Sequence, residues 1–285
     1  MNRALRGEHK QPMNATVISL INRKGGVGKT SCTYHLAGTL AKAGRRVLLL
    51  DNDPQANLSA GFWGPEILPA ISPEQSIATL YDPGPAPLPE ALVQPTPIEN
   101  ICLVPGSAHL DHFNQARQDE WGASLYGMRD FLAECRPAYD VVLIDCAPTL
   151  LLASWAALVA ADGVIVPLQC EDFGAQGLAP ILDAVEAVRS GPNPALRLLG
   201  FLISMIDRRL GIHLAYEAQL RSMYGSDVFA AAVPLAKDYK EAVASRSPIS
   251  HYKPKSAAAK VVAGLADELL GRLQDRVGAG ERRVA

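Results

Sequence analysis

Residues 16–31 read TVISLINRKGGVGKTS, and this stretch decides the fold. Its first part, Thr16–Ile21, is an apolar, β-rich run of strand length, and apolar residues at helical spacing follow over Ser31–Ala43. The glycine-rich turn between them lets backbone N–H groups surround an anion, because no Cβ stands in the way. The positive end of the following helix points at the same anion. This order of strand, turn and helix predicts a phosphate-binding loop.

This loop carries two lysines, one more than the common pattern G-x-x-x-x-G-K-[ST] specifies. Lys29 is expected to place its charge on the terminal phosphates, and the Thr30 hydroxyl to coordinate Mg²⁺. The first glycine of the common pattern would fall at Arg23, and a second lysine, Lys24, stands inside the loop instead. The residues of this segment expected to contact a nucleotide are Lys24, Gly25, Gly26, Val27, Gly28, Lys29, Thr30 and Ser31.

Further apolar runs alternate with helical segments along the chain. The runs are almost continuously apolar, which is typical of parallel strands covered by helices on both faces. We therefore predict an α/β fold with a doubly wound, mainly parallel sheet flanked by helices. The later strands are expected at Arg46–Leu50, Ile101–Val104, Tyr139–Ile144, Gly163–Leu168 and Leu198–Ile206, with Val228–Val233 as a short edge strand. The later helices are expected at Gly174–Arg189, Ile212–Met223 and Ser256–Arg276.

The chain is predicted to form a single domain over 15–277, with flexible tails at 1–14 and 278–285. Residues 64–97 contain nine prolines, which is unusual within an alternating α/β pattern. We interpret this stretch as an excursion from the domain, with one short helix near Ser76–Tyr81, rather than as a separate unit.

Composition limits the classes of protein to which the chain can belong. Five cysteines without a C-x-x-C pair argue against a disulfide framework or a structural zinc site and suit a reducing cytoplasm. The formal net charge of −2 gives the chain as a whole no general affinity for nucleic acid. Residues 201–285, however, hold 13 Lys and Arg against 9 Asp and Glu. This local excess indicates a polyanionic partner, and random variation of surface charge is the alternative.

Aspartates follow two of the expected strands. Asp51 and Asp53 stand in the segment DNDPQAN after the second strand, and Asp145 ends the run VVLID. Carboxylates at the carboxyl ends of parallel strands face the crevice in which ligands bind. A buried acid without a partner is costly, so a bound Mg²⁺ ion explains Asp145 well. A polar turn is the alternative for the two earlier aspartates.

With these motifs the sequence resembles the ParA/MinD family of ATPases over roughly residues 15–270, and most closely its ParA (Soj-like) partition branch. The resemblance rests on K-G-G-x-G-K-T and D-x-D-P-Q, and it implies a P-loop NTPase fold of the SIMIBI type with ATP and Mg²⁺ as ligands. In that family the extra lysine, here Lys24, reaches the phosphates of a partner in an ATP-sandwich homodimer. Asp53 matches the aspartate that orients the attacking water, and Asp51 would lie nearer the Mg²⁺ ion. The resemblance thus makes Lys24, Lys29 and Asp53 the expected catalytic residues, and Thr30, Asp51 and Asp145 the expected metal ligands.

The chain departs from the family in two other segments. It reads D-C-A-P-T from Asp145, where the family usually reads D-C-P-P-S, which leaves the aspartate intact. Ala232–Leu235 resembles the family segment close to the base, which implies that adenine lies near Pro234. A plain strand end is the alternative for this segment.

ParA-like ATPases bind DNA without sequence preference when they are dimeric and ATP-bound, for which phosphate contacts from Lys and Arg suffice. Arg209, in I-D-R-R-L, matches a family position implicated in DNA contact. The segment KDYKEAVASRSPISHYKPK departs from the family's S-E-A-P-S-x-G-K-P-I, and a solvated charged face is the alternative there. The residues expected to bind DNA are Arg209, Lys237, Lys240, Arg246, Lys253 and Lys255.

The function implied by the resemblance is partition or positioning of DNA or another cargo through slow ATP hydrolysis. Such an ATPase is cytoplasmic and nucleoid-associated, and a ParB-like or cargo-adaptor protein stimulates it. A MinD-like membrane-cycling ATPase is the alternative, although the terminal helix lacks the basic and aromatic faces of a membrane-surface helix. A reductase like the nitrogenase iron protein would need cysteines at the positions that hold an iron–sulfur cluster. A DNA-binding regulator would lack ATPase activity.

Overall fold

A computed structural model describes residues 14–170 and 175–274 of the chain. Both expected tails, apart from Asn14, lie outside these residues. So do Gly174, at the start of one expected helix, and residues 275–276 at the end of another.

The centre of the molecule is a seven-stranded sheet with the order β3-β4-β2-β5-β1-β6-β7. All neighbouring strands run parallel except β3, which pairs antiparallel with β4. The predicted doubly wound, mainly parallel sheet is confirmed. The strands are β1 Thr16–Leu20, β2 Val47–Asn52, β3 Gln94–Pro95, β4 Ile101–Val104, β5 Val141–Cys146, β6 Gly163–Gln169 and β7 Arg197–Ser204.

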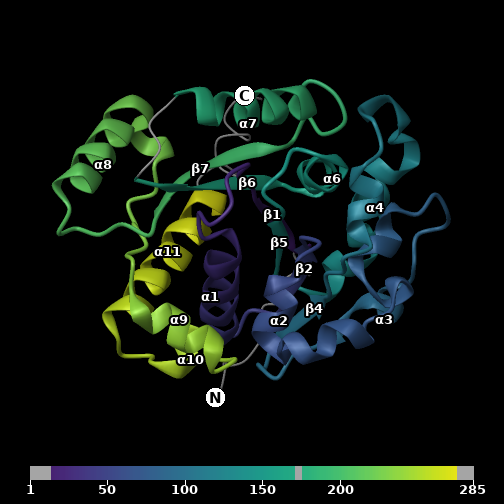
Figure 1. The fold of residues 1–285 in the computed structure, drawn as a ribbon, viewed down its shortest axis with the longest axis horizontal. Coiled ribbons are helices and arrows are strands. Elements are labelled where there is room, and N and C mark those ends of the chain that lie inside the picture. Colours follow the sequence, from purple (N-terminus) through teal and green to yellow (C-terminus); the bar gives the residue numbers. More distant parts are fainter. Residues whose placement is uncertain (1–13, 171–174, 275–285) are drawn as a thin grey trace, which may run out of the picture.

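Helices cover both faces of the sheet (Figure 1). On one face lie α1 Lys29–Lys42, α2 Asn57–Trp63, α9 Lys237–Ala244, α10 Ile249–Tyr252 and α11 Ala257–Gln274. On the other lie α3 Pro89–Leu92, α4 Leu110–Asn114, α5 Gly127–Cys135, α6 Leu152–Ala160, α7 Ala175–Arg189 and α8 Gly211–Tyr224.

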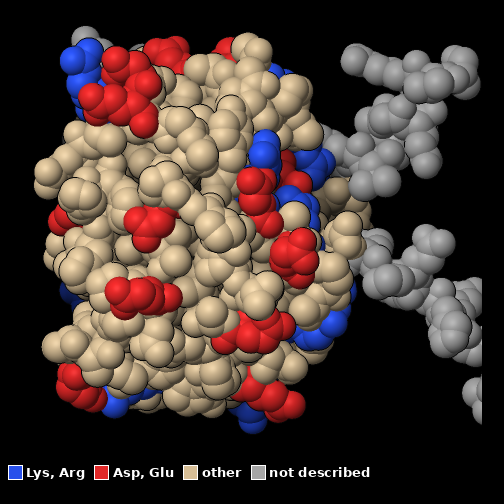
Figure 2. Space-filling view, turned by 90° about the vertical axis from the view of Figure 1, so that its right-hand side faces the viewer, with Lys and Arg blue, Asp and Glu red and all other residues tan. Residues whose placement is uncertain are grey.

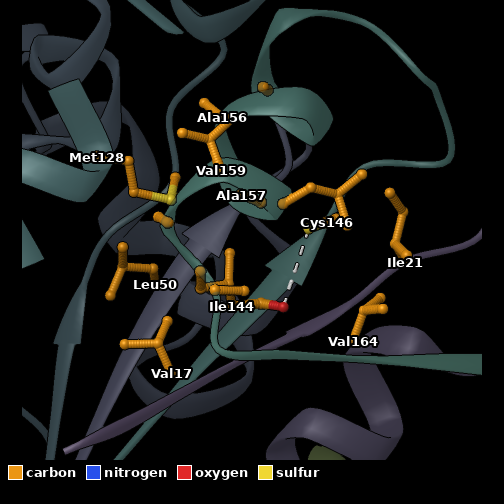
Figure 3. Close-up of a cluster of buried hydrophobic side chains, with 14 of the residues drawn as sticks. Val17, Ile21, Leu50, Met128, Ile144, Cys146, Ala156, Ala157, Val159 and Val164 are labelled. Atoms are coloured by element: carbon orange, nitrogen blue, oxygen red, sulfur yellow. Dashed lines mark hydrogen bonds between the residues drawn. The ribbon is translucent and has the colours of Figure 1, made fainter. Parts of the chain in front are cut away.

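The strands alternate between these two cores along their length. In β1, for example, Val17 packs into the core under α5 and α6, whereas Ile18 packs into the core under α1. Figure 3 shows the first core, where Val17, Leu50 and Ile144 from three neighbouring strands face Met128 and the alanines of α6. Because the central strands bury both faces, they read as continuous apolar runs.

The prediction of a short edge strand at Val228–Val233 is wrong. Only isolated bridges join this segment and Pro234 to the end of the sheet. The N–H groups of Phe229 and Val233 donate to the carbonyls of Phe201 and Ile203, but side chains take up much of the remaining backbone. Arg272 donates to the carbonyl of Val228, and Arg221 donates to those of Phe229 and Ala230. The carboxylate of Glu268 accepts from the N–H groups of Ala230 and Ala231. A backbone satisfied by side chains has no need of a strand ladder.

The proline-rich residues 64–97 hold more local structure than the single short helix expected. That helix corresponds to the 3₁₀ turn Ile77–Tyr81, which Ser76 caps by accepting a hydrogen bond from the N–H of Ala78 at 3.4 Å. Two further 3₁₀ turns, Pro65–Ala70 and Pro73–Gln75, precede it, and α3 and β3 follow. Pro begins both of these turns, since its fixed φ suits a first helical position.

Among the described residues, none of the helices combines the length and the apolar character needed to cross a membrane.

Candidate nucleotide-binding site

The loop between β1 and α1 has the backbone of an anion cradle. Gly26 and Gly28 have φ angles of 76° and 83°, a left-handed conformation that side-chain-bearing residues avoid. Gly28 is the N-cap of α1, so the first N–H groups of that helix open onto the loop. The loop therefore presents backbone donors and a helix N-terminus to one point, as phosphate binding requires.

Three residues outside the glycine-rich motif hold this loop in place. Asn22 accepts from the N–H of Lys24 at 2.9 Å and donates to the carbonyl of Pro167 at 2.7 Å. Gln169, at the end of β6, donates to the carbonyl of Gly26 at 3.0 Å. Ser204, at the end of β7, donates to the carbonyl of Val27 at 2.6 Å. Side chains at the carboxyl ends of the neighbouring strands β1, β6 and β7 thus hold the backbone of the cradle in place.

The two lysines of the loop occupy different environments. Lys29 is only 6% exposed, and its Nζ donates to the carbonyl of Lys24 at 3.1 Å. Burial lowers the pKa of Lys29, and the nearby Asp145, Cys146 and Asp53 oppose that shift. Lys24 is exposed on the surface of the loop. Lys29 is therefore buried at the cradle, whereas Lys24 is exposed on the loop.

Asp51 and Asp145 lie side by side at the ends of β2 and β5, where they are paired in register. Both side chains are completely buried. Oδ2 of Asp51 accepts from the N–H and the hydroxyl of Ser59 at 2.7 and 2.6 Å, but its Oδ1 has no hydrogen-bond partner among the described residues. Burial raises the pKa of Asp51 to about 7, against the hydrogen bonds from Ser59.

Asp145 is the stronger indication of a bound cation. Neither of its carboxylate oxygens makes a hydrogen bond of normal geometry within the described residues. Burial and then the charge of Asp51 raise the pKa of Asp145 well above its usual range, while the nearby Thr30 hydroxyl and Lys29 ammonium oppose this. An orphaned buried carboxylate beside a hydroxyl fits a Mg²⁺ ion.

A cation here would depend on more than protein ligands. The described residues contain no group of three or more His, Cys, Asp or Glu side chains arranged to hold a metal by themselves. Magnesium usually binds through one or two carboxylates together with water and substrate phosphates. Thr30, Asp145 and the free oxygen of Asp51 fit that kind of shared coordination.

Asp53 lies beside the same centre, after the end of β2. Its side chain is 7% exposed, and its Oδ1 accepts from the N–H of Gln55 at 2.9 Å. The turn continues through Ala56, which has a φ of 49° and precedes α2. Local backbone geometry therefore fixes one carboxylate oxygen of Asp53 and leaves the other for a ligand or water.

A cavity of about 410 Å³ adjoins the cradle on the side of α9. Gly28 and Ser31 line it together with Pro234, so the structure brings the expected base-binding residue next to the loop, although Pro234 is distant in sequence. Thr30 and Ser31 also line a neighbouring cavity of about 470 Å³ between α1 and α2.

Most of the cations expected to bind DNA gather at the corner formed by α9, α10 and the residues that follow, and four of the six are held in ion pairs. Arg209 pairs with Asp207 at 2.6 Å, and Arg246 pairs with Glu66. Lys253 pairs with Asp238 and Glu241 at 2.9 and 2.6 Å, and Lys237 lies 3.6 Å from Glu241. Lys240 and Lys255 are exposed and form no ion pair within the described residues.

A parallel sheet whose first strand leads through this glycine cradle into a helix, with aspartates at the tips of the neighbouring strands, defines a P-loop nucleotide-binding protein. Comparison with known proteins narrows this class. A family model described as "AAA domain" matches residues 15–198. The chain is 36% identical to the chromosome partitioning protein ParA of Caulobacter vibrioides, over 91% of this chain and 96% of that protein. It is also 36% identical to the chromosome-partitioning ATPase Soj of Thermus thermophilus, over 90% and 96%. The chain belongs to the ParA/Soj family of partition ATPases.

Solved structures agree with this fold and with its expected ligands. Cobyrinic acid a,c-diamide synthase from Mycobacterium smegmatis superimposes with a TM-score of 0.73 and 30% identity, covering 90% of this chain and 94% of that one, and it holds ADP and magnesium. A second structure of that protein, with an ATP analogue and magnesium, gives a TM-score of 0.74 at 29% identity over 91% and 96%. The prediction of ATP and Mg²⁺ is confirmed at the level of these relatives.

Proposed function

We propose that this chain is a partition ATPase. It binds ATP and Mg²⁺ at the cradle, pairs with a second copy through the nucleotide, holds DNA without sequence preference, and positions DNA or another cargo through slow hydrolysis. The observation that carries this proposal is the exposed Lys24 within a phosphate cradle, in a chain 36% identical over 91% of its length to a chromosome partitioning protein.

Phosphoryl transfer depends on positioning and charge neutralisation more than on a strong base. Lys29 donates to the terminal phosphates, and a phosphate oxygen replaces the Lys24 carbonyl that its Nζ otherwise contacts. Asp53, with one oxygen fixed by Gln55, orients the attacking water with the other. Mg²⁺ held by Thr30 and Asp145, with Asp51 close by, would neutralise the charge of the β- and γ-phosphates.

In this proposal, Lys24 contacts the phosphates of the nucleotide that the second subunit binds. Its exposed position separates it from the buried Lys29, so the two lysines can serve phosphates of different nucleotides. A reaction that is complete only when two chains face each other turns over slowly and acts as a switch. A ParB-like or cargo-adaptor protein that favours this arrangement would stimulate it.

DNA binding in this proposal uses backbone phosphate contacts, which depend strongly on salt. The corner of α9 and α10 supplies most of the candidate cations, and Lys255 need break no ion pair to contact a phosphate. On the side where α3 and α4 lie, Figure 2 shows a mostly uncharged surface with scattered acidic side chains, and basic side chains mainly toward its edges. A cytoplasmic, nucleoid-bound protein follows from DNA binding of this kind.

Co-sedimentation tests the proposal, with Lys24→Ala and the matched neighbour Arg23→Ala. Wild-type protein and Arg23→Ala should sediment with non-specific DNA in ATP and Mg²⁺ but not in ADP. Lys24→Ala should lose at least about tenfold in DNA affinity, because a monomer presents half of the phosphate contacts. Equal DNA binding by Lys24→Ala contradicts the proposal. Sedimentation with anionic liposomes instead of DNA would favour the MinD-like alternative.

A further inference from the structure

The cavity beside α9 is the place where a nucleotide held by the cradle would extend. Its volume of about 410 Å³ lies in the range of roughly 300–1,000 Å³ that small-molecule sites occupy. Gly28 and Ser31 line it from the phosphate loop and α1, and Pro234 and Leu235 line it from the segment before α9. These last two residues are therefore available to the nucleoside end of a ligand whose phosphates lie on the cradle.

The rotation of α9 places one particular lysine at this cavity. Tyr239 is 6% exposed, and its hydroxyl donates to the carbonyl of Ala258 at 3.1 Å, which anchors the helix against α11. Lys240, Val243 and Ala244 are spaced three and four residues apart, share one side of the helix, and all line the cavity. Lys237 does not line it and pairs with Glu241 instead.

Lys240 also differs from its neighbours in charge balance. Lys237, Arg246 and Lys253 each have a carboxylate within the chain, whereas Lys240 has none among the described residues. The rest of the cavity is largely apolar, with Val233, Leu235 and Met205 among its lining residues. An uncompensated ammonium group at the edge of an apolar cavity is a donor that suits the ring nitrogens of a base or the hydroxyls of a ribose.

We propose that Lys240 binds the nucleoside part of the nucleotide, by donating from its ammonium group to acceptor atoms of the base or ribose, and does not bind DNA. This inference rests on the proposed function in one respect, since it requires the phosphates to lie on the cradle. Under this inference, Lys240 contributes to the selection of the nucleotide rather than to the basic surface around α9 and α10.

Isothermal titration of ATP and of inorganic tripolyphosphate, both with Mg²⁺, tests this inference. The variants are Lys240→Gln, Lys240→Arg and Lys260→Gln, the last removing the same charge from an exposed site on α11. Lys240→Gln should weaken ATP affinity by about tenfold or more, as expected for a lost hydrogen bond from a charged donor. Its affinity for tripolyphosphate should not change. Lys240→Arg should retain most of the ATP affinity, and Lys260→Gln should match the wild type.

Three outcomes would overturn the inference. They are unchanged ATP affinity in Lys240→Gln, an equal loss for tripolyphosphate, and an equal loss in Lys260→Gln. Unchanged ATP affinity with weaker DNA sedimentation would return Lys240 to the DNA-binding set. The proposed function fails separately, if wild-type protein binds neither ligand or if Lys29→Ala binds ATP as the wild type does.

Discussion

Asp145 makes no hydrogen bond of normal geometry among the described residues, although its side chain is completely buried. Its pKa is raised by burial, so the folded protein keeps a proton on this carboxyl that the unfolded chain releases above about pH 4. Stability supplied by this group is therefore lost as the pH rises. A buried carboxylate that lowers the stability of the unliganded protein, and whose charge a bound cation would neutralise, is typical of a functional site.

Asp145→Asn tests this cost directly. In the absence of ligand, the variant should be more stable than the wild type at pH 8, by about 1–3 kcal/mol in the free energy of unfolding, because no charge remains to be desolvated. The gain should be smaller at pH 5, because lower pH favours the neutral form of the wild-type carboxyl, whose pKa burial raises. Denaturant titration at both pH values measures the difference, with the exposed Asp130→Asn as control. The variant should also lose most of the thermal stabilisation by ATP and Mg²⁺; a full shift would contradict a metal role.

The residues of the cradle could be predicted because they are contiguous in sequence. The glycines, both lysines and Thr30 form a pattern whose spacing alone indicates a phosphate loop. The residues that support the loop could not be predicted in this way. Gln169 and Ser204 bond to carbonyls 143 and 177 residues away, and only the register of the sheet brings them together.

At the scale of elements, α1 is joined to the corner of α9 and α10 by a buried histidine. His35 is 2% exposed, and its Nδ1 accepts from the N–H of Ile249, at the start of α10, at 3.1 Å. Its ring also lies 5.0 Å from that of Tyr239 on α9. Burial lowers the pKa of His35 to about 4. The contact between the nucleotide helix and the basic corner thus requires a neutral imidazole.

This contact predicts a specific acid sensitivity. The unfolded chain protonates His35 below about pH 6.5, whereas the folded chain protonates it only near pH 4. Stability should therefore fall as the pH drops through this window, by about 3 kcal/mol for this one group. His35→Asn keeps an acceptor for Ile249 but does not titrate. The difference in unfolding free energy between variant and wild type should shift by that amount in favour of the variant between pH 7 and pH 4. A pH-independent difference would refute the role of His35.

Elements were predictable where an apolar run was sufficient evidence. The strands β4 and β6 begin at the predicted residues, since nearly continuous Ile, Leu and Val define them. The segment Val228–Val233 is similarly apolar but forms no strand, because the side chains of Arg221, Glu268 and Arg272 take up its backbone groups. Side-chain bonds of this kind are set by tertiary structure and leave no local pattern.

For the whole molecule, the proposed function requires two chains to share one reaction. Asp53 lies near Lys29, just after the end of β2. The hydrogen bond from the N–H of Gln55 orients its carboxylate and occupies only one of the two oxygens. If Asp53 positions the attacking water, its loss stops hydrolysis but leaves binding of ATP and pairing of chains intact. The protein should then accumulate as the ATP-bound dimer, which hydrolysis would otherwise convert to the ADP form.

Asp53→Ala should therefore trap a stable dimer in ATP and Mg²⁺, with twice the 30.4 kDa mass of one chain by light scattering. ATP turnover should fall by about 10²-fold or more, the typical scale for loss of a positioned catalytic group. The exposed Asp82→Ala should behave as the wild type. Combining Asp53→Ala with Lys24→Ala should restore the monomer, since Lys24 supplies the contact between chains. Either of two outcomes would contradict the proposed ATP-sandwich dimer. They are a monomeric ATP complex of Asp53→Ala, and a dimer that persists in the Lys24→Ala, Asp53→Ala double variant.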